Sequence, residues 1–372
     1  MKFKTLQSFI LFIFMISILS CGNSSIVFKD KNLEKIIKSR LKIHDREILT
    51  RDVQSIKGLK LYDNDITNLS GLENLTSLEY LDLSSNKIKD VTALRKLTNL
   101  KYLYIGLNDV KDLSPLSNLN KLETLDLSGN HLNDLSPIAN LNMLKVLYLD
   151  YNKIEDLSPL ANLTNLTTLK LNENKIKDLS HLAKLKKLDF LWIGTNANLT
   201  NISALAELTN LKTLRIRENN ISDISSLAKL NNLNELTFTF LKVKDISAIS
   251  KLTNLKKIII SNSKGLDISA FSKLINLSEL VIARSNISEI APLSDLTNLI
   301  ELHLYRNKIS DIKPLAKLTK LTNLDLSNNI ITNVAPLAKL TKLKDLSLEG
   351  NNIKNKSTLK NLTSTKITWV KK

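Results

Sequence analysis

The chain of 372 residues repeats one pattern of hydrophobic and polar positions. Two leucines separated by one residue precede an asparagine, as in Leu81-Asp82-Leu83-Ser84-Ser85-Asn86, and the pattern recurs at 125–130 and 324–329. The slot of Asn86 occurs fourteen times between positions 64 and 351, at intervals of 22 residues except for one interval of 23. A period maintained over this length predicts a tandem array of similar structural units.

The alternation of leucine with other residues predicts a short strand that directs both leucines to one side. The asparagine then turns the chain inward, where its amide can bond backbone groups of neighbouring turns. We therefore expect a ladder of structural asparagines along the array. The ladder is predicted to include Asn86, Asn108, Asn130, Asn152 and Asn174.

A second motif, Asp-Leu-Ser-Pro-Leu, occupies 112–116 and 156–160 on the return side of the repeat. Serine as a helix cap and proline at the first helical position predict a 3-10 helix or a single helical turn. The whole pattern, L-x-x-L-x-L-x-x-N-x-I/L, resembles the leucine-rich repeat. The resemblance implies an α/β solenoid of horseshoe form. It would have a parallel sheet of about fourteen short strands on the concave face and the short helices on the convex face.

The two ends of the array differ from the repeats at 56–355. In residues 26–55, Asp30 precedes apolar residues at helical spacing, which predicts an N-terminal helical cap over the first repeat. Residues 356–372 are expected to cap the last repeat, because they are too few for another domain.

The N-terminus has the pattern of a targeting segment. Lys2 and Lys4 precede an apolar run at 9–19, which is shorter than the ~20 residues of a membrane span, so residues 1–20 are predicted to be a signal peptide. The sequence Ile18-Leu19-Ser20-Cys21-Gly22 resembles the bacterial lipobox, which implies cleavage before Cys21, its lipidation, and a lipidated tether at 21–25. Several acyl chains hold a protein stably on a membrane. The alternative is an ordinary signal peptide with an incidental cysteine.

The amino-acid composition limits which partners and which kinds of site the chain can have. The net charge of +17 makes an anionic lipid or polysaccharide an electrostatically suitable partner, although the lysines can equally form a solvated rim. The single cysteine excludes an internal disulfide, and the four histidines occupy unlike slots. We therefore expect no enzyme activity, no cofactor and no metal site. The signal peptide argues against a nucleic-acid partner.

Aromatic and basic residues gather beside the core leucines of the predicted strands. All seven tyrosines are expected in these slots, which lie on the concave face, and exposed Tyr, Trp and Arg are typical binding anchors. The alternative is that aromatic residues are simply favoured in strands. The predicted ligand-binding residues are Tyr80, Tyr102, Tyr104, Tyr148, Tyr151, Phe190, Trp192, Arg215, Arg217, His303 and Tyr305.

The zone 195–290 departs from the repeat. It holds the one-residue insertion, and the asparagine slot becomes Leu241, Ser263 and Ser285. A leucine cannot make the ladder bond, so we expect a weaker ladder and a local change in curvature here. Simple repeat decay is the alternative, and the sequence leaves open whether this zone is a separate binding region.

The 22-residue repeat with Asp-Leu-Ser-Pro-Leu-Ala at 156–161, together with Phe28-x-Asp30-x-Asn32-Leu33, resembles the internalin type of bacterial leucine-rich repeats. The resemblance implies a non-enzymatic surface protein that binds host receptors with its concave face. No cell-wall sorting motif or immunoglobulin-like module follows the repeats in this sequence, and the lipobox would supply the anchor.

These features together predict a monomeric lipoprotein of the cell envelope. Its concave face would bind another protein, either a host surface receptor or an envelope component, or an envelope glycan. The alternative function is a structural scaffold that organises envelope components without a host ligand.

Overall fold

The structure is a computed structural model that describes residues 24–239 and 242–369. The predicted signal peptide, Cys21 and Leu241 lie outside the described residues. The chain divides into two compact units, residues 1–166 and 167–372, which we call unit 1 and unit 2.

Unit 1 begins with two helices, α2 (Lys31–Leu41) and α3 (Thr50–Val53), within the predicted cap. Its strands pair in parallel and in sequence order. They are β1 (Gly58–Lys60), β2 (Tyr80–Asp82), β3 (Tyr102–Tyr104), β4 (Thr124–Asp126) and β5 (Val146–Tyr148). The 3-10 helices of this unit are η1 (Leu72–Asn74), η2 (Thr92–Lys96), η3 (Ser114–Leu116), η4 (Ser136–Ile138) and η5 (Ser158–Leu160).

Unit 2 continues the same alternation, again with parallel strands in sequence order. Its strands are β6 (Thr168–Lys170), β7 (Phe190–Gly194), β8 (Thr213–Arg217), β9 (Glu235–Thr239), β10 (Lys257–Ser261), β11 (Glu279–Ala283), β12 (Glu301–His303), β13 (Asn323–Asp325), β14 (Asp345–Ser347) and β15 (Lys366–Thr368). Its 3-10 helices are η6 (Ser180–Lys184), η7 (Ser203–Glu207), η8 (Ser225–Lys229), η9 (Ser247–Lys251), η10 (Ser269–Lys273), η11 (Ala291–Leu293), η12 (Lys313–Lys317), η13 (Ala335–Lys339) and η14 (Lys356–Leu359).

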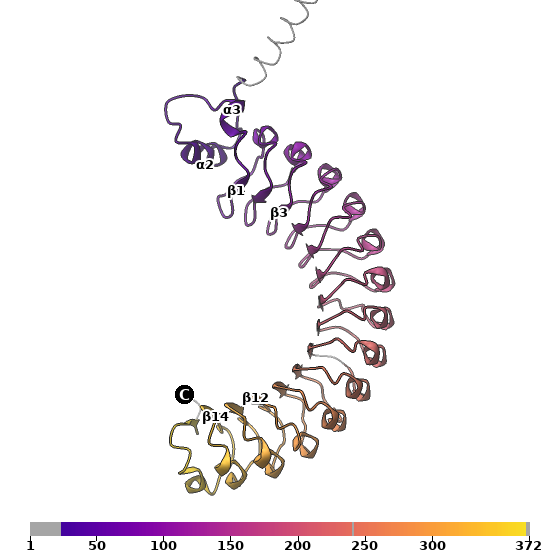
Figure 1. Cartoon of the computed structure of the whole chain (residues 1–372), viewed down its shortest axis with the longest axis vertical. Helices are drawn as coiled ribbons and strands as arrows, with labels where there is room; N and C mark the ends of the chain where they lie inside the picture. The colour runs from indigo at the N-terminus through magenta and orange to yellow at the C-terminus, as the bar shows by residue number, and fades with distance from the viewer. Residues whose placement is uncertain (1–23, 240–241, 370–372) are drawn as a thin grey trace, which may run out of the picture. The chain divides into compact units, whose positions relative to one another are not determined.

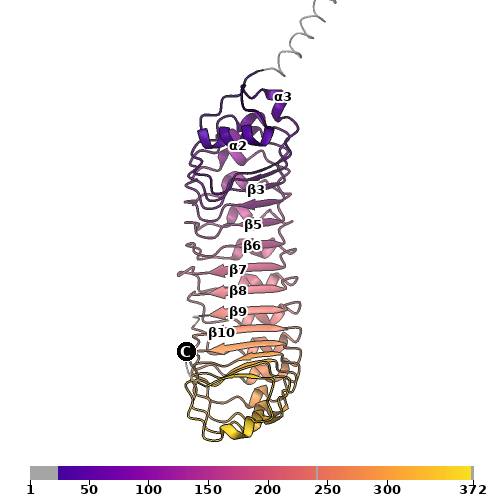
Figure 2. The same ribbon diagram turned by 90° about the vertical axis from the view of Figure 1, so that its left-hand side faces the viewer.

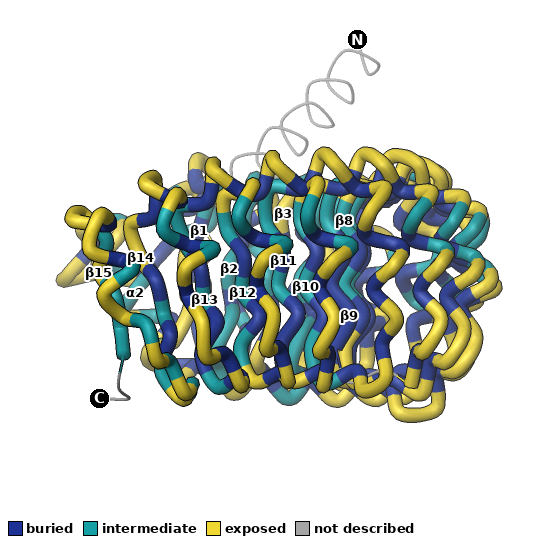
Figure 3. Tube along the Cα trace, turned by 90° about the horizontal axis from the view of Figure 1, so that it is seen from below, coloured by how far each residue is buried: buried dark blue, intermediate teal, exposed yellow. Residues whose placement is uncertain are grey.

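Each repeat forms one coil, with its strand on one side and its 3-10 helix on the opposite side (Figure 1). Within each unit the strands lie side by side and point the same way (Figure 2). Buried and exposed residues alternate around every coil (Figure 3), and the buried ones are the periodic leucines, such as Leu81 and Leu83 at 0% exposure. The predicted leucine-rich repeat fold is therefore confirmed.

The number of strands differs slightly from the prediction. The described residues contain fifteen strands instead of about fourteen, because the C-terminal segment supplies η14 and β15. Strand β15 pairs with β14 through Leu346 and Ile367, although no asparagine of the repeat follows it. The segment predicted as a C-terminal cap thus adds a further strand beside β14.

The asparagine ladder satisfies backbone groups at the turn that follows each strand. The Nδ2 of Asn130 donates to the carbonyl of Leu127 in its own coil at 3.1 Å and to that of Ile105 in the preceding coil at 3.0 Å. Its Oδ1 accepts from the backbone N–H of Val110 at 2.9 Å. Three other predicted ladder residues of unit 1, Asn86, Asn108 and Asn152, make the corresponding bonds. These bonds continue the connection between coils where the strand ladder stops.

The residue before each ladder asparagine adopts a left-handed backbone conformation. Leu107 has φ 55° and Tyr151 has φ 57°, and neither is a glycine. Such a conformation costs about 1–2 kcal/mol for an L-residue, so the surrounding bonds must hold it in place. The ladder asparagine, buried directly after this residue, provides that constraint.

In unit 2 the ladder is weaker where serine replaces asparagine. Asn174 donates to Asn172 O of its own turn at 3.0 Å, and Asn196 and Asn219 each donate to a carbonyl of the preceding coil at 3.0 Å. By contrast, Ser263 and Ser285 donate only to carbonyls of their own turns, at 3.4 and 2.9 Å. A serine hydroxyl is too short to donate to the preceding strand, which supports the predicted weakening. The strands β7–β11 in this zone extend over five residues, so backbone pairing replaces part of the lost bonding.

The start of each 3-10 helix differs from the prediction. Ser114 is the first residue of η3 and does not cap it. Instead Asp112, two residues earlier, accepts from the Ser114 N–H at 2.8 Å and from its hydroxyl at 2.9 Å. The expectation that serine is the cap is therefore wrong, since the aspartate of Asp-Leu-Ser-Pro supplies the acceptor.

Asp30 joins the N-terminal cap to the first repeat. Its Oδ1 accepts from the N–H groups of Asn32 and Leu33 at the start of α2, at 3.0 and 3.1 Å. Its Oδ2 accepts from the N–H of Thr67 at 2.8 Å. Burial alone would raise the pKa of Asp30, but the hydrogen bonds outweigh it and hold this pKa below its usual value.

The ladder predicts unequal costs for two equivalent substitutions. Asn130→Ala leaves a buried N–H and two carbonyls without their side-chain partner, so we expect a loss of about 3 kcal/mol of unfolding free energy. Among the described residues, Ser263→Ala removes one long side-chain hydrogen bond, and we expect it to cost about 1 kcal/mol or less. Urea unfolding followed by circular dichroism measures both, and equal losses would contradict the ladder's role.

Candidate functional site

The candidate site is the open side of the sheet. The side chains immediately before and between the two core leucines of each strand point away from the core, and we call them the sheet face. The parallel register places Tyr80 beside Tyr102 and Asp82 beside Tyr104. Neighbouring strands lie about 4.8 Å apart, so residues 22 positions apart in sequence become neighbours in space.

Four of the predicted binding residues gather on the sheet face of unit 1. We call Tyr80, Tyr102, Tyr104 and Tyr148 the tyrosine cluster. The ring centroid of Tyr80 lies 6.5 Å from that of Tyr102 and 5.7 Å from that of Tyr104, with interplanar angles of 42° and 47°. These distances are typical of favourable aromatic pairs. Tyr102 is nevertheless 38% exposed, so the rings support one another and still present surface to a partner.

Two carboxylates alternate with these tyrosines in the slot between the core leucines. Along strands β2 to β5 the slot carries Asp82, Tyr104, Asp126 and Tyr148. Both aspartates are half-buried, and each Oδ1 accepts from the backbone N–H two residues later, at 3.0 Å from Ser84 and 2.9 Å from Ser128. Neither aspartate forms an ion pair with another described residue. The sheet face of unit 1 is therefore both aromatic and acidic.

The environment disfavours ionisation of two tyrosine hydroxyls. Burial raises the pKa of Tyr104, and the neighbouring tyrosines and the carboxylates of Asp126 and Asp82 raise it further. Burial also raises the pKa of Tyr148, with a contribution from Asp126. A protonated tyrosine hydroxyl can donate a hydrogen bond to a ligand.

Ion pairs border the tyrosine cluster at the starts of the strands. Glu79 lies 2.8 Å from Lys101 and 3.5 Å from Lys57, and Glu123 lies 2.7 Å from Lys145. The hydrogen bond from Lys101 lowers the pKa of Glu79. Opposite charges thus balance one another along this border. Asp82 and Asp126 form no ion pair with a described residue, although Lys60 lies beside Asp82 in the parallel register.

Unit 2 carries a second aromatic group, which we call the tryptophan cluster: Phe190, Trp192 and Arg215. The guanidinium carbon of Arg215 lies 5.7 Å from the ring centroids of both Phe190 and Trp192, within the range of cation–π contact. Arg215 also pairs with Glu235 at 2.8 Å. The Nε1 of Trp192 is buried and has no hydrogen-bond partner among the described residues. Here the chain's own cation covers the aromatic faces.

The sheet face changes character beyond the tryptophan cluster. Thr237, Ile259 and Val281 occupy the slot between the two buried core residues of β9–β11 and form an uncharged strip. Lys257 and Glu279 lie beside it and pair with each other at 2.8 Å. This strip offers apolar packing surface but few groups that could orient a ligand.

The remaining predicted residues are spread over other positions. His303 lies on the sheet face of β12, and Arg217 ends β8 within 3.7 Å of Glu218. Tyr305 is half-buried in the turn after β12. Tyr151 is 63% exposed in the turn after β5, so the position expected for it beside the core leucines is corrected. Arg217 lies two residues after Arg215 on β8, next to the tryptophan cluster, whereas His303 and Tyr305 belong to a later repeat.

Sequence analysis missed the two carboxylates of unit 1. Asp82 and Asp126 occupy the same slot as Tyr104, one repeat before it and one repeat after it. The 22-residue period could have identified them, because equal slots become neighbours in a parallel sheet. What the sequence does not show is that each aspartate uses one oxygen for its own turn.

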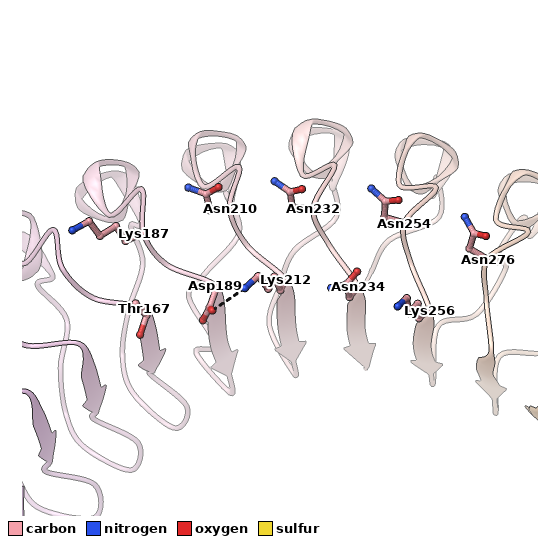
Figure 4. Close-up of a pocket in the computed structure, with 10 residues that line it drawn as sticks. All are labelled: Thr167, Lys187, Asp189, Asn210, Lys212, Asn232, Asn234, Asn254, Lys256 and Asn276. Atoms are coloured by element: carbon pink, nitrogen blue, oxygen red, sulfur yellow. Dashed lines mark hydrogen bonds and ion pairs between the residues drawn. The ribbon is translucent and has the colours of Figure 1, made fainter.

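A polar groove of about 830 Å³ follows one flank of unit 2, between the 3-10 helices and the starts of the strands (Figure 4). One row of its lining holds one asparagine per repeat: Asn210, Asn232, Asn254 and Asn276. Each Nδ2 donates to a backbone carbonyl of the preceding repeat, at 2.8 to 2.9 Å. These amides therefore form a second ladder that joins the coils, which accounts for their regular spacing.

Within residues 24–239 and 242–369, no group of three or more His, Cys, Asp and Glu side chains could hold a metal ion. Across the same residues, no helix has the length and apolar character needed to cross a membrane. The sheet face instead presents aromatic rings, hydroxyls and carboxylates. These groups recognise a ligand through packing, hydrogen bonds and charge.

Two family descriptions match the chain. "Leucine-rich repeat region" matches residues 107–329, which is more than half of the sequence. "Leucine Rich repeats (2 copies)" matches residues 54–96 and 319–363. Among curated proteins no match was found.

Solved structures agree with these descriptions. An internalin (inlF) from Listeria monocytogenes is 35% identical with a TM-score of 0.80, over 86% of this chain and 95% of that chain. A leucine-rich repeat protein from Leptospira interrogans is 23% identical with a TM-score of 0.67, over 86% and 97%. The leucine-rich repeat ectodomain of the Arabidopsis thaliana receptor kinase GASSHO1/SCHENGEN3 is 21% identical with a TM-score of 0.61, over 86% and 44%. The last two similarities concern the fold alone.

The repeats, the sheet face and these matches define a class of binding scaffolds. The chain belongs to the leucine-rich repeat family, and its repeats are of the internalin type. Members of this family are typically non-enzymatic proteins that bind other proteins. The fold therefore favours a protein partner for the sheet face.

The acidic surroundings of Tyr104 predict a measurable titration. The difference in tyrosinate absorbance between the wild type and Tyr104→Phe should have a midpoint above pH 10, because burial and the carboxylates disfavour the phenolate. The same difference measured in an Asp126→Asn background should have a lower midpoint that remains raised by burial. Circular dichroism at each pH controls for unfolding. An unchanged midpoint after Asp126→Asn would contradict the coupling of carboxylate and ring.

Proposed function

We propose that this chain is a monomeric lipoprotein of the bacterial cell envelope that binds another protein through its sheet face. The lipobox-like sequence ending at Cys21 supports the anchor. The leucine-rich repeat family and the internalin relative support a protein ligand, including a receptor on a host cell surface. An envelope protein or glycan is the second class of ligand that this surface would suit.

The tyrosine cluster is the observation that carries the proposal. Tyrosines supply large, amphipathic contact area at low entropic cost and are enriched among binding hot spots. A general preference of aromatic residues for strands explains a single tyrosine. It does not explain two further rings packed against Tyr80, one of them 38% exposed, on the open side of a sheet.

A structure of the same fold supports a protein-like ligand. The plant receptor ectodomain was solved in complex with CASPARIAN STRIP INTEGRITY FACTOR 2. The internalin relative matches this chain over nearly its whole length. These comparisons favour a binding protein over a scaffold without a ligand.

Tyr104→Ala combined with Trp192→Ala tests the proposed surface. We expect this double variant to lose at least tenfold in the yield of a partner captured from envelope or host-cell extracts, because it removes a central ring from each cluster. Tyr62→Ala is the matched control, since Tyr62 is 58% exposed but lies outside the sheet face. Undiminished capture by a folded double variant would contradict the proposal.

Cys21→Ser tests the proposed anchor. The wild type should partition into detergent with the membrane fraction, because acyl chains on Cys21 contribute about 0.8 kcal/mol for each buried CH2 group. The serine variant should appear in the soluble fraction or retain its signal peptide. Ser25→Ala is the control, and membrane retention of processed Cys21→Ser would contradict lipidation.

A further inference from the structure

The alternating tyrosines and aspartates of unit 1 identify the chemistry of a partner, an inference that rests on the proposed function. Asp82 and Asp126 lie one strand away from Tyr104 on either side, so their carboxylates are about 10 Å apart with a ring between them. A cation above that ring would contact the π-system and attract both carboxylates. The arrangement therefore suits a positively charged side chain.

Each of the two aspartates keeps one carboxylate oxygen available to accept a hydrogen bond from such a partner. Each aspartate uses Oδ1 for the N–H of its own turn, and neither Oδ2 has a hydrogen bond or an ion pair among the described residues. No lysine or arginine of the described residues lies over the rings of Tyr80, Tyr102 or Tyr104. This acidic patch lies on a chain whose net charge is +17, so it differs in sign from most of the molecule.

In unit 2 an arginine of the chain itself occupies a comparable environment of rings and carboxylate. Arg215 lies over Phe190 and Trp192 and pairs with Glu235 at 2.8 Å. Rings and a carboxylate of the sheet face therefore hold a guanidinium in this protein. Tyr80, Tyr102 and Tyr104 offer rings beside two carboxylates, and no cation of the described residues lies over these three rings.

We propose that the tyrosine cluster binds a protein segment that presents lysine or arginine side chains, with one cation over Tyr104 between Asp82 and Asp126. The partner is thus a basic protein or peptide. A second copy of this chain is the alternative occupant, because its own surface is rich in lysine.

Peptide binding to the full chain tests this assignment. Fluorescence anisotropy would compare labelled (Gly-Arg)4, (Gly-Gln)4 and (Gly-Glu)4 at low and at physiological salt. We expect (Gly-Arg)4 to bind best and to weaken with salt. The double variant Asp82→Asn/Asp126→Asn and the single variant Tyr104→Ala should each weaken it about tenfold, because cation–π and charge-pair contacts are lost.

Asp325→Asn is the matched control. Asp325 occupies the same slot on β13 and makes the same 2.9 Å bond to the N–H of Ser327, but its neighbours in register are His303 and Ser347. Asparagine keeps the Oδ1 acceptor in all three positions, so the turns remain intact. We expect Asp325→Asn to change (Gly-Arg)4 binding less than twofold.

Three outcomes would overturn the assignment. Equal losses from Asp325→Asn and the double variant would indicate general attraction to negative charge. Equal binding of (Gly-Glu)4 would exclude a cationic ligand.

Self-association that is abolished by Asp82→Asn/Asp126→Asn in sedimentation experiments would identify a second copy of this chain as the occupant. If peptide preference is absent while Tyr104→Ala/Trp192→Ala still loses the captured partner, this inference fails and the proposed function stands.

Discussion

The hydrogen bonds of one buried asparagine per repeat are the interaction on which the rest of the structure depends. The strands are only three to five residues long, so a parallel backbone ladder alone leaves many turn groups without partners. Asn130 supplies those partners in its own coil and in the preceding coil simultaneously. Each coil is thereby held in register with its neighbour, and the leucines of successive coils bury one another.

This constraint also determines how a binding surface can be encoded. Because the register is fixed, a ligand meets residues that are 22 positions apart, and each slot of the repeat becomes a column on the sheet. The structural columns accept little variation, whereas the sheet-face columns are free to vary. Unit 1 uses this freedom for Asp82, Tyr104 and Asp126, and unit 2 uses the same column for Trp192 and Arg215.

Sequence reasoning predicted most of the fold, because the leucine period reflects burial, and burial here is local and repeated. It placed the serine of Asp-Leu-Ser-Pro wrongly as a cap, since a pattern does not reveal that Asp112 accepts both bonds. It located Tyr80, Tyr102, Tyr104 and Tyr148 on the sheet, yet it missed Asp82 and Asp126. Their importance depends on which oxygen each turn uses and on the lack of an ion pair to either carboxylate among the described residues. Both are properties of side-chain geometry.

The two aromatic clusters differ in a way that bears on specificity. A ligand that covers Trp192 must displace Arg215 from the ring. This breaks a cation–π contact and disturbs the Arg215–Glu235 pair, so the ligand must first replace those contacts. The rings of Tyr80, Tyr102 and Tyr104 carry no such contact with the described residues, and the carboxylates beside them repel anions. A sheet face of this kind gains selectivity from the charges that it leaves unmatched, since an acidic partner would meet Asp82 and Asp126 without compensation.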